Sequence, residues 1–335
     1  MKELIAKLVA GESLDAASME HAMDQVLRGE ASSAQIAALL VGLRMKGETV
    51  DEIAAAARSM RRHAVRVTVQ VRGPIVDTCG TGGDGAGSFN ISTVAALVVA
   101  ACGVTVAKHG NRAASSQAGS ADVLEALGVD IDAPPERIAR CIEQVGIGFM
   151  FARAHHPAMK HVGPVRSELG VRTLFNFLGP LANPAGATHQ LLGVGDGARL
   201  EAMADVLCRL GTEGAWVVHG HGGLDEVSLG GRTRVAEVRG GSVRCFEVGP
   251  EDFGVSPAEL TALRGGDAAE NAAVTRAILA GERGPKRDAV VVNAAAALCA
   301  AGVAASPMEA ARLAASALDD GRASAKLSAW VAFSG

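Results

Sequence analysis

The stretch PIVDTCGTGGDGAGSFNISTVAALVVAACGVTVAKHG, residues 74–110, decides the fold of this chain. It reads as a short β-strand that ends at Gly80, a loop containing five glycines, an alanine- and valine-rich helix, and a second strand that ends at Gly110. Strand, loop, helix and strand in this order form a βαβ unit, which implies parallel strands. Because ligands of such sheets bind outside the carboxyl ends of the strands, the glycine loop lies where a ligand is expected.

The alternation of strand and helix continues beyond this unit. A helix is expected near residues 121–127, and the apolar stretch 289–305 reads as a strand that runs into a buried helix. That stretch is shorter than the roughly 20 strongly apolar residues that span a membrane. These patterns predict an α/β domain whose mainly parallel central sheet is flanked by helices. Further strands are expected at residues 147–152, 189–195, 214–220, 233–240 and 288–293.

The first 65 residues follow a helical pattern. Apolar side chains recur there with a spacing of 3.6 residues, and no convincing strand is present. The helices are expected to start at Ser13, Ser32 and Thr49, whose hydroxyls can accept hydrogen bonds from the first turn. Residues 157–184 are again helical in pattern, with breaks at their two Gly-Pro pairs. We therefore expect a small all-helical domain, residues 1–65 joined by helices from about 157–184, and a large α/β domain, residues 66–335.

Composition excludes several classes of function. The 335 residues include 32 basic and 36 acidic side chains, which give a net charge of −4, and only 10 aromatic ones. A negative chain with few stacking platforms is a poor partner for nucleic acid phosphates and bases. The six cysteines form no CxxC pair, so neither a zinc ribbon nor a disulfide framework is indicated. The N-terminus has no signal-peptide pattern, and a cytoplasmic location with no membrane partner is expected.

The glycine loop is best explained as a phosphate cradle. Gly80, Gly82 and Gly85 satisfy GxGxxG, but a dinucleotide site expects an acid about 20 residues further on, and residues 85–121 contain none. No GK[ST] ends the loop, so the Walker pattern fails as well. Backbone N–H groups and the hydroxyls of Ser88, Ser92 and Thr93 remain, at the expected start of a helix. A plain glycine-rich turn with a capping hydroxyl is the alternative.

A second polar loop, residues 108–120, follows the next strand. It carries Lys108, Arg112, amide side chains and three serines, with no carboxylate. Such a loop suits an anion with several oxygens, and Ser120 stands where another helix starts. Either cation alone could be a solvated surface charge. Two such loops on successive strands of one sheet favour a ligand with two phosphate groups.

An adjacent acidic pair, Asp225 and Glu226, can supply the counter-ion. Magnesium prefers hard oxygen ligands and takes one or two carboxylates beside the phosphates of a substrate. Adjacent acids in a turn are also common as plain solvated groups. His219 and His221 could suggest zinc, but no HExxH pattern or regularly spaced third ligand supports it.

Together these segments resemble the anthranilate phosphoribosyltransferase family. The resemblance is carried by DTCGTGGDGAGSFNIST (77–93), KHGNRAASSQAGSADVLEALGV (108–129), HHPAMKHVGPVRSELGVRTLFNFLGPLANP (155–184) and DEVSL (225–229). It extends over essentially the whole chain. The GTGGD loop is shared with pyrimidine nucleoside phosphorylases, whereas the GPVR and LGPLANP segments are particular to this family.

The resemblance implies a set of site residues. It implies magnesium bound by Ser92, Asp225 and Glu226, with two ions per site, and a catalytic contribution from Lys108 and the two acids. It implies contacts to anthranilate from Gly80, Asn111 and Arg166. Ser88 stands where the family commonly has threonine, and Met159 stands in the aromatic-substrate channel. The implied contacts to phosphoribosyl pyrophosphate (PRPP) are Gly80, Gly83, Asp84, Ser88, Asn90, Ile91, Ser92, Thr93, Lys108, His109, Gly110, Asn111, Arg112, Ala113, Ala114, Ser115, Ser116 and Ser120.

The implied activity is transfer of 5-phosphoribosyl from PRPP to the amine of anthranilate in tryptophan biosynthesis. No general base stands out, and His109 or water could accept the proton. Two other functions stay open on the same architecture: a pyrimidine nucleoside phosphorylase, and a non-enzymatic relative that binds nucleic acid. The apolar faces of the helical segment indicate a homodimer, which the resemblance also implies.

Overall fold

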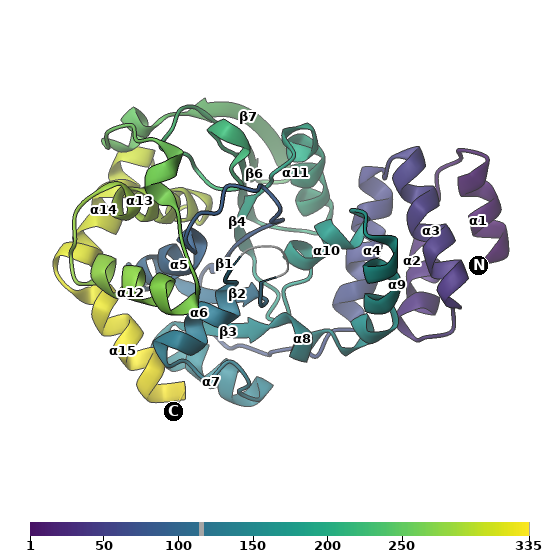
Figure 1. The fold of residues 1–335 in the computed structure, drawn as a ribbon, viewed down its shortest axis with the longest axis horizontal. Coiled ribbons are helices and arrows are strands. Elements are labelled where there is room, and N and C mark those ends of the chain that lie inside the picture. The colour runs from purple at the N-terminus through teal and green to yellow at the C-terminus, as the bar shows by residue number, and fades with distance from the viewer. Residues whose placement is uncertain (114–116, 335) are drawn as a thin grey trace.

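The computed structural model describes residues 1–113 and 117–334, and its centre is one seven-stranded sheet (Figure 1). The strand order is β3-β2-β1-β4-β5-β6-β7. The first five strands in this order are parallel, and β6 and β7 are antiparallel, so the prediction of a mainly parallel sheet is confirmed. The strands are β1 Ile75–Gly80, β2 Thr105–Gly110, β3 Ile147–Phe151, β4 His189–Gly193, β5 Gly214–His219, β6 Thr233–Arg239 and β7 Ser242–Val248.

The chain reverses direction across the sheet at β1. From β1 it moves to β2 and β3 on one side, and it then returns to β4 on the other side of β1. A crevice for a ligand forms at such a reversal, outside the carboxyl ends of the two flanking strands. Gly80, Gly110 and Gly193 are the last residues of β1, β2 and β4, so the two polar loops begin at this edge.

One face of the sheet is covered by a continuous apolar layer of helices. In it α5 and α13 pack against each other, and α14 and α15 pack against α5. Buried apolar side chains of these helices form one cluster with side chains of the sheet. The helices on this side of the sheet are α5 Ile91–Ala101, α6 Ser120–Leu127, α12 Ala268–Leu279, α13 Pro285–Ala300, α14 Pro307–Asp319 and α15 Arg322–Ser334. α7, Pro135–Val145, packs Ile138 and Ile142 against Gly148 of β3, on the opposite face.

The other face is covered by α11, Leu200–Arg209, which packs on β5, β6 and β7 and in turn contacts α4 of the N-terminal segment. That segment is helical throughout, as expected, and forms α1 Lys2–Val9, α2 Ala16–Leu27, α3 Ser33–Lys46 and α4 Val50–Arg62. Ser32 and Thr49 cap α3 and α4, each in a reciprocal capping box. The expected start at Ser13 is wrong, because Asp15 caps α2 with a carboxylate oxygen 2.7 Å from Ser18 N.

The segment between β3 and β4 returns to these N-terminal helices. It contains α8 Ala152–His155, a 3₁₀ turn at Pro157–His161, α9 Gly163–Leu169 and α10 Phe175–Leu181. α9 packs on α3 and α10 on α4, and Figure 1 shows α9 beside α3 and α4. Their apolar side chains share one buried cluster with α11 and the sheet. The break at Gly163 is found, whereas Pro180 lies inside α10. The division into two domains near residue 65 stays a prediction.

Two sequence-based expectations for the second half of the chain differ from the structure. Residues 288–293 are not a strand but part of α13, which is buried all round, so its apolar run shows no helical periodicity. Conversely, β7 was not expected, although Gly240 and Gly241 join it to β6 as a two-residue hairpin with positive φ angles of 58° and 74°. Short 3₁₀ turns occupy Gly197–Arg199, His221–Gly223, Pro250–Phe253 and Leu260–Leu263. Within the described ranges no helix is long and apolar enough to cross a membrane.

Candidate active site

Asp225 is seated between the ends of two neighbouring parallel strands. A side chain at Gly80 would collide with the Asp225 carboxylate, and one at Gly193 would collide with the Asp225 main chain. Both strands therefore need glycine as their last residue for this loop to approach. The backbone N–H of Gly82 donates to Asp225 Oδ2 at 2.8 Å. The acidic pair thus lies against the glycine loop.

Glu226 holds the other end of the same loop, where α5 begins. The backbone N–H of Ser92 donates to Glu226 Oε1 at 3.1 Å. The Thr78 hydroxyl, from β1, donates to Ser92 O at 3.0 Å. A carboxylate at the N-terminus of a helix is favoured by the helix dipole and by the free N–H groups there. The adjacent pair therefore brackets the glycine loop from Gly82 to Ser92.

Among the described residues, Asp84, Asp225 and Glu226 form no ion pair with a lysine or arginine. Burial, reinforced by the nearby Asp84 charge, raises the pKa of Asp225 to about 6. Burial, reinforced by Asp225, raises the pKa of Glu226 to about 8, although Lys108 acts in the opposite direction. Asp84 Oδ2 is buried and has no hydrogen-bond partner among the described residues. Few positive charges stabilise the ionised form of these carboxylates, so the site favours a bound cation.

These donors fit magnesium held jointly with a substrate. Across residues 1–113 and 117–334, no three His, Cys, Asp or Glu side chains are grouped so as to hold a metal by themselves. A site with two adjacent carboxylates and one hydroxyl leaves positions for water and phosphate oxygens, as magnesium prefers. Zinc has no protein ligand set here.

Lys108 is buried and lies beneath the glycine loop rather than in the solvent. Its side chain is 2 % exposed, and Nζ donates to the Thr78 carbonyl at 2.5 Å. Burial lowers its pKa, and the charges of Asp77, Cys79 and Glu226 oppose this shift. The Lys108 ammonium is buried close to Glu226, and an anion that bound nearby would stabilise its charged form.

Asp77 and Asn183 fix the strand that carries Lys108, and neither was a predicted site residue. Asp77 is fully buried; its Oδ1 accepts from His109 N at 3.1 Å and its Oδ2 accepts from Asn183 Nδ2 at 2.8 Å. Asn183 Nδ2 also donates to Ala107 O at 2.8 Å. The pKa of Asp77 is raised by burial and lowered by Lys108. These bonds join β1, β2 and the loop after α10.

Asn293 is a further residue that sequence reasoning missed. It lies in the middle of α13 and is completely buried. Its side chain bonds both backbone groups of Val227, the residue after Glu226. The only signal in the sequence is a single amide within a run of alanine and valine.

In the second loop, Arg112 forms ion pairs with acidic residues of α6 and is not free to bind an anion. Asn111 O accepts from the Ser120 hydroxyl at 3.3 Å, which closes the loop at the start of α6. Arg112 is exposed and pairs with Asp122 and Glu125, both at 2.8 Å. Binding of an anion by Arg112 therefore requires exchange of these partners. A side chain at Gly110 would collide with the Ser120 hydroxyl. Ala114, Ser115 and Ser116 lie outside the described residues.

The start of α5 connects the two loops. Asn90 Nδ2 donates to Ala118 O at 3.1 Å, and Asn90 Oδ1 accepts from Asn271 Nδ2 at 3.0 Å. Ile91 is buried in the core, so only its backbone can face a ligand. Thr93 Oγ1 is buried without a partner among the described residues. Ser88 lies opposite Arg264 in an isolated antiparallel bridge, which anchors the end of the loop.

Two arginines lie on the segment between β3 and β4. Arg166, on α9, is half-buried, and burial lowers its pKa. Its guanidinium lies 5.8 Å from the centre of the Phe175 ring and forms no ion pair within the described residues. Arg172, which was not predicted, donates to Gly82 O at 3.3 Å and to Gly83 O at 3.4 Å. Arg172 thereby joins this segment to the glycine loop.

Two buried histidines next to the second strand are neutral. His109 Nδ1 lies 3.2 Å from Gly179 O, and because a carbonyl only accepts, Nδ1 carries the proton. Burial, followed by the charge of His156, lowers the pKa of His109 to about 3. Burial likewise lowers the pKa of His156 to about 4. The Nε2 atoms of both rings are buried without partners in the described part of the chain.

The predicted residues thus fall into separate groups. Hydrogen bonds and shared burial bring together Gly80, Ser92, Lys108, Asp225 and Glu226, with Asp84 beside them. No described hydrogen bond or ion pair joins Arg166 or Asn111 to this cluster. A substrate would have to bridge the groups.

Comparison with known proteins agrees with this arrangement. Residues 72–324 match the model of the glycosyl transferase family, a/b domain, and residues 2–64 match that of the glycosyl transferase family, helical bundle domain. The chain is therefore a glycosyltransferase of this two-part type.

Relatives narrow this class further. The chain is 54% identical over 333 residues to anthranilate phosphoribosyltransferase from Moorella thermoacetica, covering 99% of this chain and 98% of the relative. The crystal structure of anthranilate phosphoribosyltransferase from Thermus thermophilus superposes with a TM-score of 0.94 at 51% identity, covering 98% of each chain. The chain belongs to the anthranilate phosphoribosyltransferases. Of the three activities left open by the sequence, this family membership supports the first.

More distant solved structures carry ligands. Anthranilate phosphoribosyltransferase from Saccharomyces cerevisiae in complex with PRPP and Mg has a TM-score of 0.91 at 27% identity, covering 99% of this chain and 96% of that chain. The same yeast enzyme in complex with 4-fluoroanthranilate has a TM-score of 0.89 at 26% identity, with the same coverage.

Proposed function

We propose that this chain transfers the 5-phosphoribosyl group of PRPP to the amine of anthranilate, forming N-(5-phosphoribosyl)anthranilate and pyrophosphate in tryptophan biosynthesis. The observation that carries this proposal is that two buried carboxylates hold the two ends of the glycine loop: Asp225 accepts from Gly82 N, and Glu226 accepts from Ser92 N. Family membership and the ligands of the yeast relative support the same reaction.

We assign the pyrophosphate side of the site to the carboxyl ends of β1 and β4. Asp225, Glu226 and the Ser92 hydroxyl would hold two magnesium ions, which when bound neutralise the charge that develops on the leaving pyrophosphate. Lys108, buried beneath the loop, adds fixed positive charge near Glu226. Fixed groups of this kind stabilise a leaving anion without reorganising during the reaction.

PRPP itself would lie between the two polar loops. The N–H groups of Gly80, Gly83 and Asn90 suit its phosphates, with hydroxyls from Ser88 and Thr93. The N–H groups of Ile91 and Thr93 bond Phe89 O and Asn90 O, so a phosphate at the first turn of α5 would have to replace these acceptors. The second loop, Lys108–Ser116 and Ser120, would hold the other phosphate, with Arg112 released from Asp122 and Glu125. Asp84 and His109 are the remaining proposed contacts to PRPP.

Anthranilate would bind beside Arg166. The planar guanidinium can hold the carboxylate of anthranilate through two parallel hydrogen bonds, and it has no competing ion pair among the described residues. Gly80 and Asn111 are the proposed contacts to the rest of the molecule. Held in this way, the ring amine faces C1 of the ribose, and attack there breaks the bond to pyrophosphate. The amine is neutral at pH 7 and needs no strong base, so water can accept its proton. His109 is the weaker candidate, because burial lowers its pKa to about 3.

We further propose that the protein acts as a homodimer in the cytoplasm, assembled through its helical segment. Val9 on α1 and Met45 on α3 are 80% and 82% exposed, and these two helices pack against each other. Large apolar side chains exposed together in this way often mark an interface.

The reaction is tested by incubating the purified protein with PRPP, magnesium chloride and anthranilate, and following the loss of anthranilate fluorescence. We expect turnover that requires magnesium and ceases when PRPP is omitted. Thymidine or uridine with phosphate in place of these substrates tests the phosphorylase activity, for which we expect no product. Absence of turnover with anthranilate contradicts the proposal.

A further inference from the structure

A second cavity lies at the opposite edge of the sheet from the proposed substrate site. Its volume is about 500 Å³. Arg239, in its wall, pairs with Gly214, the first residue of β5, whereas the polar loops follow the last residues of the parallel strands. The cavity lies between the β6–β7 hairpin and the turn that joins α13 to α14. Its walls are formed by Trp216, Glu237, Arg239, Ser242, Arg244, Phe246, Cys299, Ala304, Ala305 and Pro307.

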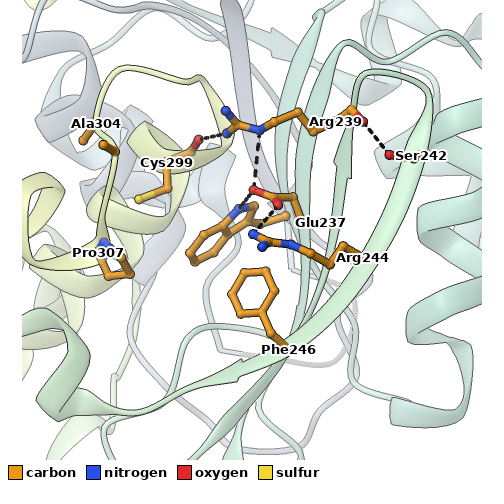
Figure 2. A pocket seen from close by; sticks show the side chains of 10 residues that line it. Glu237, Arg239, Ser242, Arg244, Phe246, Cys299, Ala304 and Pro307 are labelled. Atoms are coloured by element: carbon orange, nitrogen blue, oxygen red, sulfur yellow. Dashed lines mark hydrogen bonds and ion pairs between the residues drawn. The ribbon is translucent and has the colours of Figure 1, made fainter.

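One buried carboxylate organises the polar side of this cavity (Figure 2). Glu237 Oε1 accepts from the indole N–H of Trp216 at 3.1 Å, and its Oε2 accepts from Arg244 at 2.8 Å. Arg239 Nε lies 3.5 Å from Glu237 Oε1. The side chain of Glu237 is only 11% exposed. Arg239 and Arg244 thus share one carboxylate, so their charge is only partly offset by Glu237.

Both guanidiniums keep donors for a further anion. A guanidinium has five N–H groups. In the described part of the chain, Arg239 uses its Nε on Glu237 and one terminal nitrogen on Cys299 O, at 2.8 Å. Arg244 directs one nitrogen to Glu237 and lies 5.0 Å from the centre of the Phe246 ring, which restricts its orientation. Their side chains are 55% and 73% exposed, so a solute can reach them.

The rest of the cavity is flat and apolar. Trp216 and Phe246 form an edge-to-face pair with ring centres 5.3 Å apart. Ala304 and Pro307 form the opposite wall, as Figure 2 shows. One other acid lies close by, Glu309 on α14, and its carboxylate accepts from Ala305 N at 3.0 Å. The guanidiniums of Arg239 and Arg244 lie on either side of Glu237, the first near Cys299 and the second near the Phe246 ring. Aromatic and apolar walls with cationic groups beside them suit a planar apolar group that carries one negative charge.

We propose that this cavity binds a small aromatic carboxylate. The carboxylate group contacts the outer N–H groups of Arg239 and Arg244, and the ring lies between Pro307 and the Trp216–Phe246 pair. One carboxylate group would occupy the side of the cavity that holds the arginines, and one ring would occupy the apolar side. The site is separate from the PRPP and anthranilate sites and does not depend on their assignment.

Tryptophan fluorescence offers a direct readout, because the chain has two tryptophans, no tyrosine, and one of the tryptophans in this cavity. Phenylacetate is the probe, phenylacetamide is the same ring without the charge, and inorganic phosphate is a charge without the ring. We expect phenylacetate to change the fluorescence saturably, and Trp216→Phe to remove that change. Phenylacetamide and phosphate should each bind at least about tenfold more weakly, because each lacks one of the two interactions.

Charge variants test the arginines. Arg239→Gln combined with Arg244→Gln should weaken phenylacetate binding at least about tenfold. Arg283→Gln, which removes an exposed arginine paired with Asp319, is the matched control and should bind as the wild type does. Arg166→Gln should also retain phenylacetate binding, which separates this cavity from the proposed anthranilate site.

Four results would each overturn the proposal. They are a linear, unsaturable response to phenylacetate, equal binding of phenylacetamide or phosphate, unchanged binding in the folded double arginine variant, and loss of binding in Arg166→Gln. Circular dichroism establishes that each variant is folded, and Phe246→Leu provides an independent variant of the ring wall, for which weaker binding is expected.

Discussion

Asn293, in the middle of α13, holds Val227 by both of its backbone groups: Val227 N donates to Asn293 Oδ1 at 2.8 Å, and Asn293 Nδ2 donates to Val227 O at 3.0 Å. Asn293 Nδ2 also donates to Ala289 O, one turn earlier in the helix. Because Val227 directly follows Glu226, this amide positions the proposed magnesium carboxylates from the interior of the protein.

Asn293→Ala should therefore weaken magnesium binding as well as stability. The substitution leaves the buried N–H and C=O of Val227 unpaired, which costs about 2–4 kcal/mol of unfolding free energy. We expect the magnesium concentration that gives half-maximal activity to rise. Asn293→Asp keeps the acceptor and loses the donor, so it should fall between Asn293→Ala and the wild type. A folded variant with an unchanged magnesium requirement would show that Asn293 has only a structural role.

Removing the acidic pair should abolish activity without unfolding the protein. Asp225→Asn combined with Glu226→Gln keeps acceptors for Gly82 N and Ser92 N but removes two buried carboxyl groups whose ionised forms repel each other. We expect kcat/KM to fall at least about a hundredfold, since charge stabilisation at a leaving group is worth several kcal/mol.

The melting temperature of that variant should stay equal or rise, because the buried carboxylates are poorly compensated. Glu251→Gln with Asp252→Asn is the matched control, an exposed adjacent pair that contacts Arg232. Full activity in the Asp225–Glu226 variant contradicts the assignment.

Arg166→Ala should raise KM for anthranilate and leave KM for PRPP nearly unchanged. A hydrogen bond to a charged group is worth about 1.5–3 kcal/mol, which corresponds to a roughly 10- to 100-fold rise. Arg153→Ala, at an exposed arginine on α8, serves as the control. Equal KM values for anthranilate in the Arg166 variant and the wild type would show that Arg166 does not bind the carboxylate.

The buried histidines should make the fold less stable in mild acid. The folded-state pKa values of His109 and His156, about 3 and about 4, lie below the ordinary value of 6.5. The unfolded chain therefore binds more protons between these values, and stability is complete above pH 6.5 and declines as the pH falls toward 4 and 3. Each histidine should remove about 2 kcal/mol on going from pH 7.5 to pH 5.

Urea unfolding of the wild type and His156→Gln at both pH values measures this effect. The variant should lose about 2 kcal/mol less than the wild type over the same range. His21→Gln, at an exposed histidine on α2, should leave the pH dependence unchanged. An identical pH dependence in His156→Gln and the wild type would rule out His156 as a source of the acid sensitivity.

Val9→Glu combined with Met45→Glu should convert a dimer into a monomer. Both side chains are exposed on the packed pair α1 and α3, so the charges would not disturb the core of one chain. Light scattering after size-exclusion chromatography gives the mass directly. Leu313→Glu, on the surface of α14, is the control and should keep the wild-type mass. A wild-type protein that is monomeric at micromolar concentration would contradict the proposed interface.

Local sequence determined most of the architecture and the outline of the site. The βαβ unit at residues 74–110, the helical first 65 residues and the capping residues Ser32 and Thr49 depend on neighbours in the chain, so the pattern alone predicted them. The same holds for the glycine loop and the acidic pair, which are contiguous motifs. Residues 288–293 failed as a strand because a helix buried on all sides has no polar face to reveal its period.

Only the tertiary structure decided which distant groups meet. Gly82 and Asp225 are 143 positions apart, Ser92 and Glu226 are 134 apart, and Val227 and Asn293 are 66 apart. The parallel sheet brings them together because the carboxyl ends of its strands share one edge. Burial there changed the chemistry of the residues: it made Lys108 an interior cation and raised the pKa of Asp225 and Glu226. The sequence thus determined which groups are available, and the packing of the sheet determined their partners and their charge.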